Sequence, residues 1–159
     1  MTDTDAALQV SHVGLCVSDL GRALRFWCDG LGFTEAEGYD LDSSLVPGLG
    51  PALEIEGPVT MRSQMITRDH LRIELLHYTS PQPTGAPSVT RNTLGFTHLS
   101  LWVDDLDNVV ERLTAHGATV IASTRQSLGI DVVFLTDPDR KSTRLNSSHV
   151  ALSRMQSSA

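Results

Sequence analysis

The sequence predicts an α+β fold made of two paired βαβββ modules, with the last strand of the second module lost or replaced. First, segment 11–20 resembles segment 97–106, and the offset between them is constant, so that His98 lies 86 residues after His12. Second, each copy passes from an alternating strand pattern into a helical pattern. Third, further strand patterns follow both helices. The 159 residues suit one domain, or two small modules that share a core.

Each copy begins with a predicted strand whose two faces differ. Alternation places Val13, Leu15 and Val17 on the core face of the first strand, because successive strand side chains point to opposite faces. The residues that face the other way are His12, Gly14 and Cys16 in the first copy and His98, Ser100 and Trp102 in the second. Each strand therefore carries a histidine at the same depth.

A helix is predicted after each of these strands. Ser18 or Asp19 can cap the first helix, and Asp104 or Asp105 the second. Apolar residues then recur at helical spacing, which is typical of a core-facing stripe. These are Leu20, Ala23, Leu24, Trp27 and Leu31 in the first helix, and Leu106, Val109, Val110 and Leu113 in the second.

The remaining strands are expected near 33–39, 59–68 and 71–78, with a Pro/Gly-rich loop at 45–58, and near 119–125 and 130–136. We therefore divide a single domain, 1–138, into a first module at 9–79, a linker at 80–94 and an incomplete second module at 95–138. Residues 139–159 form a tail of different composition, which we expect to lack fixed structure.

Composition excludes several classes of protein. The formal net charge is −7 and the sequence pI about 5.2, which argues against nucleic-acid binding. Apolar runs are too short for a membrane-spanning helix, and the N-terminal segment lacks a secretory-signal pattern. Two cysteines provide no disulfide framework, so a reducing cytoplasm is the expected location.

The most unusual polar residue within a predicted strand is Glu74, in the run Leu-Arg-Ile-Glu-Leu-Leu at 71–76. Burying a carboxylate is costly unless it is paired or bound to a metal. Together with His12 and His98 it forms a nitrogen and oxygen ligand set that suits a divalent ion. The alternative is that the histidines are satisfied core residues and that Glu74 pairs with Arg72 or Arg62.

Four motifs in this order resemble the vicinal oxygen chelate superfamily, which includes glyoxalase I and methylmalonyl-CoA epimerase. They are HVGLCVSDLGRALRFWCDGLGF, LRIELL, GFTHLSLWVDDLD and VVFLTDPD, within about residues 10–138. The resemblance implies that the sheets curl around a divalent ion, which can be zinc, nickel, cobalt, manganese or iron. It implies His12, Glu74 and His98 as ligands, with a further glutamate from the last strand.

The activity that the resemblance favours is glyoxalase I-like lyase or isomerase chemistry, through an enediolate, on an α-hydroxycarbonyl or thiohemiacetal. Glu74, or the glutamate of the last strand, would remove the α-proton. The alternatives are an enzyme like methylmalonyl-CoA epimerase, an extradiol dioxygenase, or a non-catalytic drug-binding resistance protein. The partner is a small molecule, and the site can close within one chain or across a homodimer.

Substrate-pocket candidates carry a weaker signal. Cys16, Met65 and Trp102 can line a pocket, although core filling explains them equally well. Arg91 precedes the second module and could reach an anionic substrate, while a solvated loop is the more ordinary interpretation.

The tail differs sharply from the body. Residues 1–138 carry a net charge of −10, and residues 139–159 carry +3 with the chain's single lysine. Segment 139–149 resembles the in-frame translation of a common sequencing-adapter oligonucleotide, and 153–159 matches its continuation except at Gln156. We therefore expect that adapter read-through truncated the gene near position 139. Counting places Arg144 where the fourth metal ligand belongs, where it would repel a cation or pair with Glu74 and so impair the enzyme.

Overall fold

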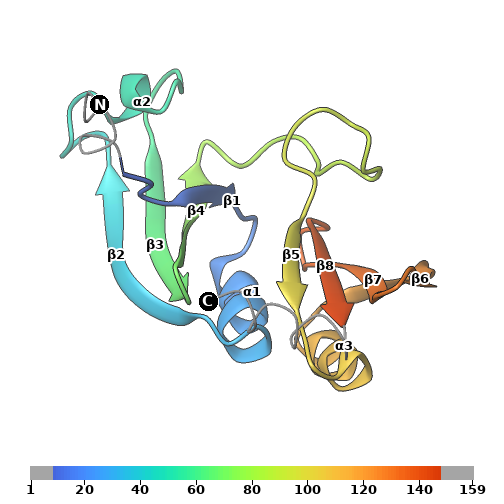
Figure 1. Cartoon of the computed structure of the whole chain (residues 1–159). Coiled ribbons are helices and arrows are strands. Elements are labelled where there is room, and N and C mark those ends of the chain that lie inside the picture. Colours follow the sequence, from blue (N-terminus) through green and yellow to red (C-terminus); the bar gives the residue numbers. More distant parts are fainter. Residues whose placement is uncertain (1–8, 148–159) are drawn as a thin grey trace, which may run out of the picture. The chain divides into compact units, whose positions relative to one another are not determined.

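The computed structural model describes residues 9–147, which divide into two compact units. Of the described residues, 9–20 and 32–83 form the first unit, and 21–31 and 84–147 form the second. Each unit holds one four-stranded mixed sheet, and the two sheets share the same strand order (Figure 1). The predicted α+β fold of two βαβββ modules is confirmed. The chain passes from the first unit to the second near residue 83.

The first sheet has the order β1-β4-β3-β2. Its strands are β1 (Val13–Cys16), β2 (Thr34–Asp42), β3 (Thr60–Arg68) and β4 (Leu71–Ser80). β1 runs parallel to β4, and the other neighbours are antiparallel. The short connection between β3 and β4 allows an antiparallel hairpin, whereas β1 and β4 are parallel and far apart in sequence.

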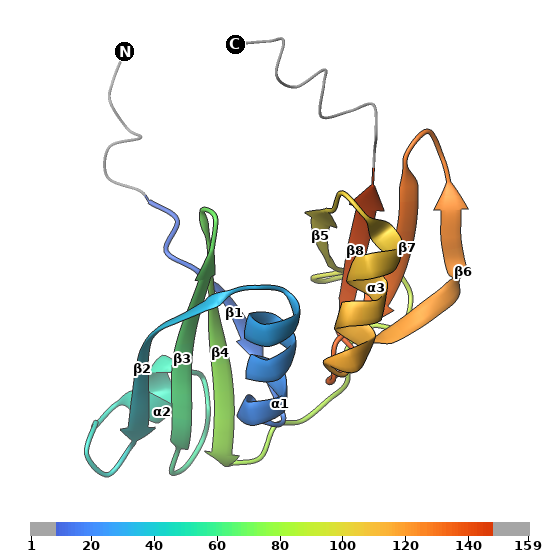
Figure 2. The same cartoon turned by 90° about the horizontal axis from the view of Figure 1, so that it is seen from below.

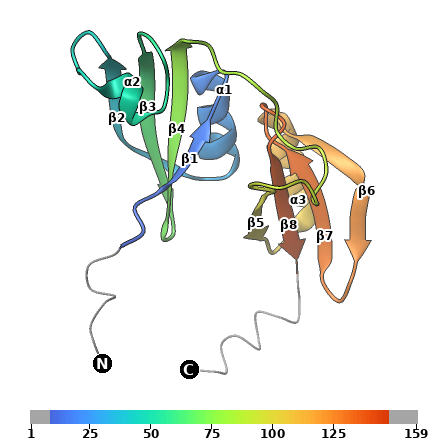
Figure 3. The same cartoon turned by 90° about the horizontal axis from the view of Figure 1, so that it is seen from above.

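Buried apolar side chains lie on both faces of the first sheet. Ile66, Ile73 and Leu75 are buried on one face. On the other, Met61 forms a cluster with Leu49, which belongs to the short helix α2 (Leu49–Ala52) in the predicted loop (Figure 3). That cluster lies at one end of this face. Glu74 and its neighbours occupy the same face further along β4.

The second sheet has the order β5-β8-β7-β6. Its strands are β5 (Leu99–Trp102), β6 (Thr119–Ser127), β7 (Asp131–Thr136) and β8 (Ser142–Ser147). As in the first sheet, the first strand pairs in parallel with the last, and the others pair in antiparallel fashion. The two units therefore repeat one pairing pattern, as the sequence repeat predicts.

Helices of the second unit pack through the predicted apolar stripes. Helix α1 (Leu20–Leu24) continues into a π-helical turn, η1 (Arg25–Gly30), where we expected one α-helix. Helix α3 (Leu106–Ala115) covers one face of the second sheet, and the Asp105 side chain caps it by accepting a hydrogen bond from the Asn108 backbone N–H at 3.0 Å (Figure 2). A Cβ built on Gly30 would lie 3.1 Å from Leu113, so glycine permits η1 and α3 to approach closely.

Strand β8 corrects our expectation for the tail. We expected no fixed structure after residue 138, yet residues 142–147 form a strand between β5 and β7. Both neighbours present free backbone groups, and a strand between them satisfies these groups whatever its side chains are. The last strand is thus present, with the residues of the adapter-like segment. The predicted remainder, 148–159, lies outside the described residues.

The side chains of β8 suit its buried position poorly. Leu145 is its only apolar residue, while Ser142, Thr143, Asn146 and Ser147 are buried polar residues. Within the described part of the chain, Ser142 Oγ, Arg144 Nε and Asn146 Oδ1 are buried without a hydrogen-bond partner. Each such group costs about 1–3 kcal/mol of stability.

Over residues 9–147, no helix has the length and apolar character needed to cross a membrane.

Candidate functional site

Each unit places a histidine just before its first strand, and this histidine lies next to a charged residue of the last strand. In the first unit the two residues are His12 and Glu74. We call these two residues, with Ser11 and Ser63, the first half-site. In the second unit the two residues are His98 and Arg144, and we call them, with Arg91 and Phe134, the second half-site. Each half-site is described within its own unit.

The first half-site is a pair of hydrogen-bonded side chains. His12 Nε2 lies 3.0 Å from Glu74 Oε2. The other ring nitrogen, Nδ1, lies 2.9 Å from Ser11 Oγ, and the other carboxylate oxygen, Oε1, accepts a hydrogen bond from Ser63 Oγ at 2.5 Å. Both side chains are therefore held from behind by a serine, which orients them toward each other.

The register of the sheet explains this pairing. Glu74 is opposite Gly14 on β1 and Met65 on β3, so these residues share one face of the sheet. The side chains of His12 and Glu74 are 32% and 20% exposed, so the pair remains accessible from solvent. Neither predicted alternative for Glu74, an ion pair with Arg72 or with Arg62, is formed: Arg72 pairs with Glu37, and Arg62 with Asp40.

The second half-site repeats the same backbone arrangement with the opposite charge. Arg144 is opposite Ser100 on β5 and Phe134 on β7. Ser100 is the repeat equivalent of Gly14, so Arg144 occupies in the second unit the register position that Glu74 occupies in the first. That this is the position of a fourth metal ligand stays a prediction.

His98 is held as His12 is, but it has a different neighbour. Its Nδ1 lies 2.9 Å from Thr97 Oγ1, the equivalent of the Ser11 contact. Its ring packs edge-on against Phe134, with 5.1 Å between ring centroids. Burial lowers the pKa of His98, and the positive charges of Arg144 and Arg91 lower it further. The imidazole is therefore biased toward its neutral form.

Arg91 completes this cluster from the preceding loop. Its guanidinium donates to the Thr97 carbonyl at 2.9 Å and to the Ser88 carbonyl at 3.0 Å. Its Cζ also lies 5.7 Å from the centroid of the Phe134 ring. Arg91 is thus anchored on the second half-site, where the ordinary interpretation of the sequence was a solvated loop.

The structure brings together two of the three predicted metal ligands, His12 and Glu74. The third, His98, belongs to the other unit, so its part in a common site stays a prediction. Within either unit, over residues 9–147, no three His, Cys, Asp or Glu side chains group as a metal site. The first unit thus supplies two candidate metal ligands, the imidazole of His12 and the carboxylate of Glu74.

The predicted substrate-pocket residues are divided between the half-sites. Cys16 is exposed and faces the same side of the sheet as Glu74, as does Met65. Trp102 is 52% exposed and lies opposite Asn146 on β8, on the face that carries Arg144. Exposure argues against core filling for Cys16 and Trp102, but their role as pocket residues stays a prediction.

Sequence reasoning missed Ser63 and Phe134, and it also missed the hydroxyls beside the two histidines. The repeat contains the signal for the hydroxyls, because a serine or threonine precedes the histidine in both copies, at 11 and 97. Only the strand pairing identifies the other two: Phe134 is opposite Arg144, and Ser63, opposite Leu76, is a diagonal neighbour of Glu74.

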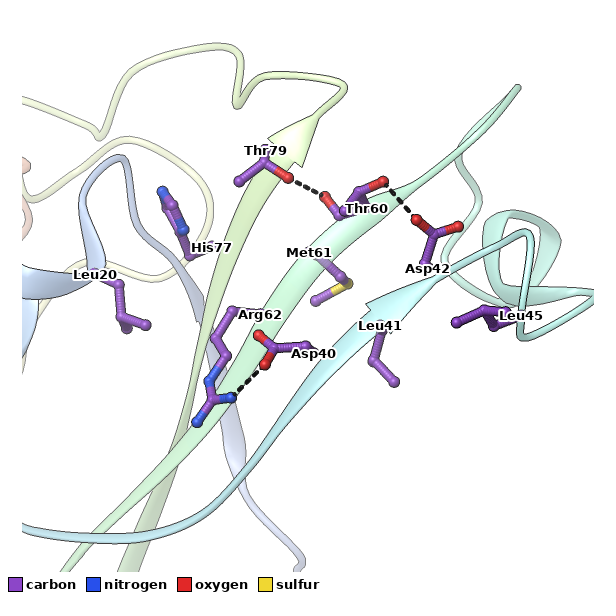
Figure 4. Close-up of a pocket in the computed structure, with 10 residues that line it drawn as sticks. All are labelled: Leu20, Asp40, Leu41, Asp42, Leu45, Thr60, Met61, Arg62, His77 and Thr79. Atoms are coloured by element: carbon purple, nitrogen blue, oxygen red, sulfur yellow. Dashed lines mark hydrogen bonds and ion pairs between the residues drawn. The ribbon is translucent and has the colours of Figure 1, made fainter.

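A pocket of about 690 Å³ in the first unit is separate from this site (Figure 4). His77 and Thr79 line it from β4, and Asp40 and Arg62 line it as an ion pair at 2.9 Å. His77 is an odd-numbered residue of the strand that carries Glu74, so the two side chains point to opposite faces. The pocket therefore does not mark the first half-site.

Comparisons with known proteins agree with this architecture. A family model described as the glyoxalase/bleomycin resistance protein/dioxygenase superfamily matches residues 11–134. A glyoxalase family protein from Bacillus cereus has a TM-score of 0.73 and 22% identity, over 88% of this chain and 93% of that one. The trypanothione-dependent glyoxalase I of Leishmania major has a TM-score of 0.61 and 16% identity, over 94% and 93%.

The fosfomycin resistance protein FosX of Listeria monocytogenes has a TM-score of 0.58 and 16% identity, over 90% of this chain and 95% of that one. No curated protein sequence matches the chain significantly. At these identities the solved structures show a shared fold alone.

Proposed function

Since the chain belongs to the glyoxalase/bleomycin resistance/dioxygenase superfamily, we propose that it descends from a metal-dependent lyase or isomerase resembling glyoxalase I. In this proposal His12 and Glu74 supply one side of a divalent-metal site and His98 is the third ligand. The substrate is a small molecule with an acidic proton beside a carbonyl, such as a thiohemiacetal or an α-hydroxycarbonyl.

The observation that carries the proposal is the His12–Glu74 pair, in which each side chain also contacts a serine hydroxyl. Two ligand atoms that each lie roughly 2.0–2.2 Å from one ion are separated by about 3.0–3.5 Å. The 3.0 Å between Nε2 and Oε2 fits that spacing. The Ser11 hydroxyl can accept a hydrogen bond from Nδ1–H, and in that tautomer Nε2 has a free lone pair for a metal. These residues therefore fit a divalent ion.

Glu74 is the proposed proton carrier. Its Oε1 accepts a hydrogen bond from the Ser63 hydroxyl, and its Oε2 faces the partly exposed His12 ring. A carboxylate in this position can take the α-proton of a bound substrate and return it to the neighbouring carbon. A bound divalent ion would supply Lewis-acid stabilisation of the negative charge that develops on the carbonyl oxygen.

Arg144 opposes this function in the chain as it stands. A guanidinium at the register position equivalent to Glu74 repels a cation instead of binding it. Loss of a supporting partner of a metal ligand typically costs 10–100-fold in affinity or activity, and loss of a direct ligand costs more. We therefore expect weak metal binding and impaired catalysis.

Metal binding is the first test. Protein treated with a chelating resin is titrated with Zn²⁺, Ni²⁺, Co²⁺ and Mn²⁺ by calorimetry. Glu74→Gln should lower the affinity at least about tenfold. Glu111→Gln, which removes an equal charge at an exposed position of α3, should leave it unchanged. Equal affinities in both variants would overturn the assignment of Glu74.

Reaction type is the second test. Exchange of the substrate α-proton with deuterium oxide is measured for thiohemiacetals and for a branched acyl-CoA, with and without metal. Metal-dependent exchange supports lyase or epimerase chemistry, and the substrate that exchanges distinguishes the two. Oxygen consumption with a catechol would instead indicate a dioxygenase. Equal ligand binding by metal-free and metal-loaded protein, with no exchange, would favour a drug-binding protein.

A further inference from the structure

We propose that the second half-site binds a small oxyanion, a carboxylate or phosphate group, between Arg144 and Arg91 beside the His98–Phe134 pair. This inference depends on the second unit alone. Its test uses metal-free protein, so its outcome is distinguishable from that of the metal proposed for His12, Glu74 and His98.

The first argument is the gathering of basic groups around one aromatic ring. Phe134 lies opposite Arg144 across the β7–β8 pairing, its ring centroid is 5.1 Å from that of His98, and the Arg91 Cζ lies 5.7 Å from the ring centroid. Two guanidiniums and one imidazole thus share one small patch of the sheet. The patch belongs to a chain whose net charge is −7, so it is not part of a generally basic surface.

The second argument is that, among the described residues of the second unit, no acid forms an ion pair with this patch. Arg91 uses two of its nitrogens to bind backbone carbonyls, which are neutral acceptors. Arg144 forms no ion pair with any described residue of its own unit (21–31 and 84–147), and its Nε is buried without an acceptor. A partly buried guanidinium without a counter-charge is costly, and a bound anion would offset this cost.

The third argument is the chemistry of the donors. A guanidinium presents parallel N–H groups that match the two oxygens of a carboxylate or phosphate. The Arg91 side chain is fixed in place by its two carbonyl contacts, so little conformational entropy is lost when an anion binds. The Asn146 amide donates to Ser100 Oγ at 2.5 Å, which orients the hydroxyl opposite Arg144.

The experiment uses the full chain, freed of metal by a chelating resin. Inorganic phosphate and acetate are added separately at constant ionic strength, and ¹H–¹⁵N spectra follow the Arg144 Nε–H signal and the amides of β5 and β8. We expect saturable shifts confined to these groups. Tighter binding of phosphate would assign a phosphorylated ligand, and tighter binding of acetate would assign a carboxylate.

Variants provide the control. Arg144→Gln should weaken binding of the preferred anion at least about tenfold. Arg112→Gln removes the same charge from an exposed position of α3 in the same unit and should change it less than twofold. Equal weakening by both variants, or shifts that never saturate, would overturn the proposal. If Arg144→Gln does not fold, the anion titration of the unaltered chain still tests the proposal. An Arg144 Nε–H signal that does not shift with phosphate or acetate would contradict it.

Discussion

The Nε2 atom of His12 lies 3.0 Å from Oε2 of Glu74, and the equivalent neighbours in the second unit are His98 and Arg144. The backbone register is the same in both units, and so is the hydroxyl that holds each histidine. The charge of the residue on the last strand, Glu74 or Arg144, therefore distinguishes a half-site that suits a cation from one that suits an anion. The charge at position 144 decides which ligand the second unit takes.

Exchanging that charge should restore a metal ligand. In Arg144→Glu, a carboxylate takes the register position equivalent to Glu74, on the strand that pairs with β5. We expect affinity for divalent metal to rise at least about tenfold by calorimetry. Arg112→Glu makes the same charge change on α3 and should give no such gain. A similar gain in both would show a general effect of net charge.

The Ser63 hydroxyl should matter for metal binding and not only for stability. Ser63→Ala removes the 2.5 Å hydrogen bond that holds Glu74 Oε1, so the carboxylate is less well oriented. We expect a loss of about 10–100-fold in metal affinity. Ser88→Ala, which removes a hydroxyl bonded to the Thr90 carbonyl in a loop, is the control. The prediction fails if Ser63→Ala only lowers the melting temperature.

Much of the strand order and of the facing of side chains was predictable, because the internal repeat encodes the same strand and helix in both units. A single offset relates the two first strands, and alternation within them predicts correctly which side chains face the core: Val17 is fully buried and Cys16 is exposed. The partnership of His12 and Glu74 follows from the same strands. Local pattern and tertiary pairing agree in these segments, which is why sequence reasoning succeeds there.

Other features depend on contacts that no local pattern records. The segment 142–147 is mostly polar, so its local pattern resembles a coil. It nevertheless forms a strand, because its backbone pairs with β5 and β7. The π-helical turn η1 continues an ordinary helical stripe, and its close packing against α3 at Gly30 is visible only in three dimensions. The position of Arg91 on Phe134 likewise depends on the path of a loop.

The polar composition of β8 predicts a simple stabilising substitution. Ser142 is 7% exposed, and its Oγ has no hydrogen-bond partner in the described part of the chain. Ser142→Ala should therefore raise the free energy of unfolding by about 1 kcal/mol, measured by urea denaturation. Ser147→Ala removes a hydroxyl that donates to the Asp104 carbonyl at 3.4 Å, so it should give no gain. Destabilisation by Ser142→Ala would show that the hydroxyl is satisfied in solution.

Stability should also depend on pH through Asp137, which is 4% exposed at the turn before β8. Burial raises its pKa above the ordinary value of 3.8, and this outweighs the lowering by Lys141 and by the backbone N–H groups of Lys141 and Asp139 that donate to it. The folded protein therefore holds this proton more tightly than the unfolded chain does. Below the unfolded pKa both states are protonated; as the pH rises through the folded pKa, the wild type loses stability.

Asp137→Asn removes that titration, so the variant should gain stability relative to the wild type between pH 4 and pH 7. The measurement is urea denaturation of both proteins across this range at constant salt. A constant offset between them is expected as well, because an amide NH₂ group replaces one carboxyl oxygen at this buried turn; only the slope of the difference with pH reports the titration. Asp29→Asn, which replaces a carboxyl at an exposed position of η1, is the matched control measured over the same range. A flat difference for Asp137→Asn would mean that this carboxyl has the same pKa in the folded and unfolded states, and that burial at the turn does not govern its proton.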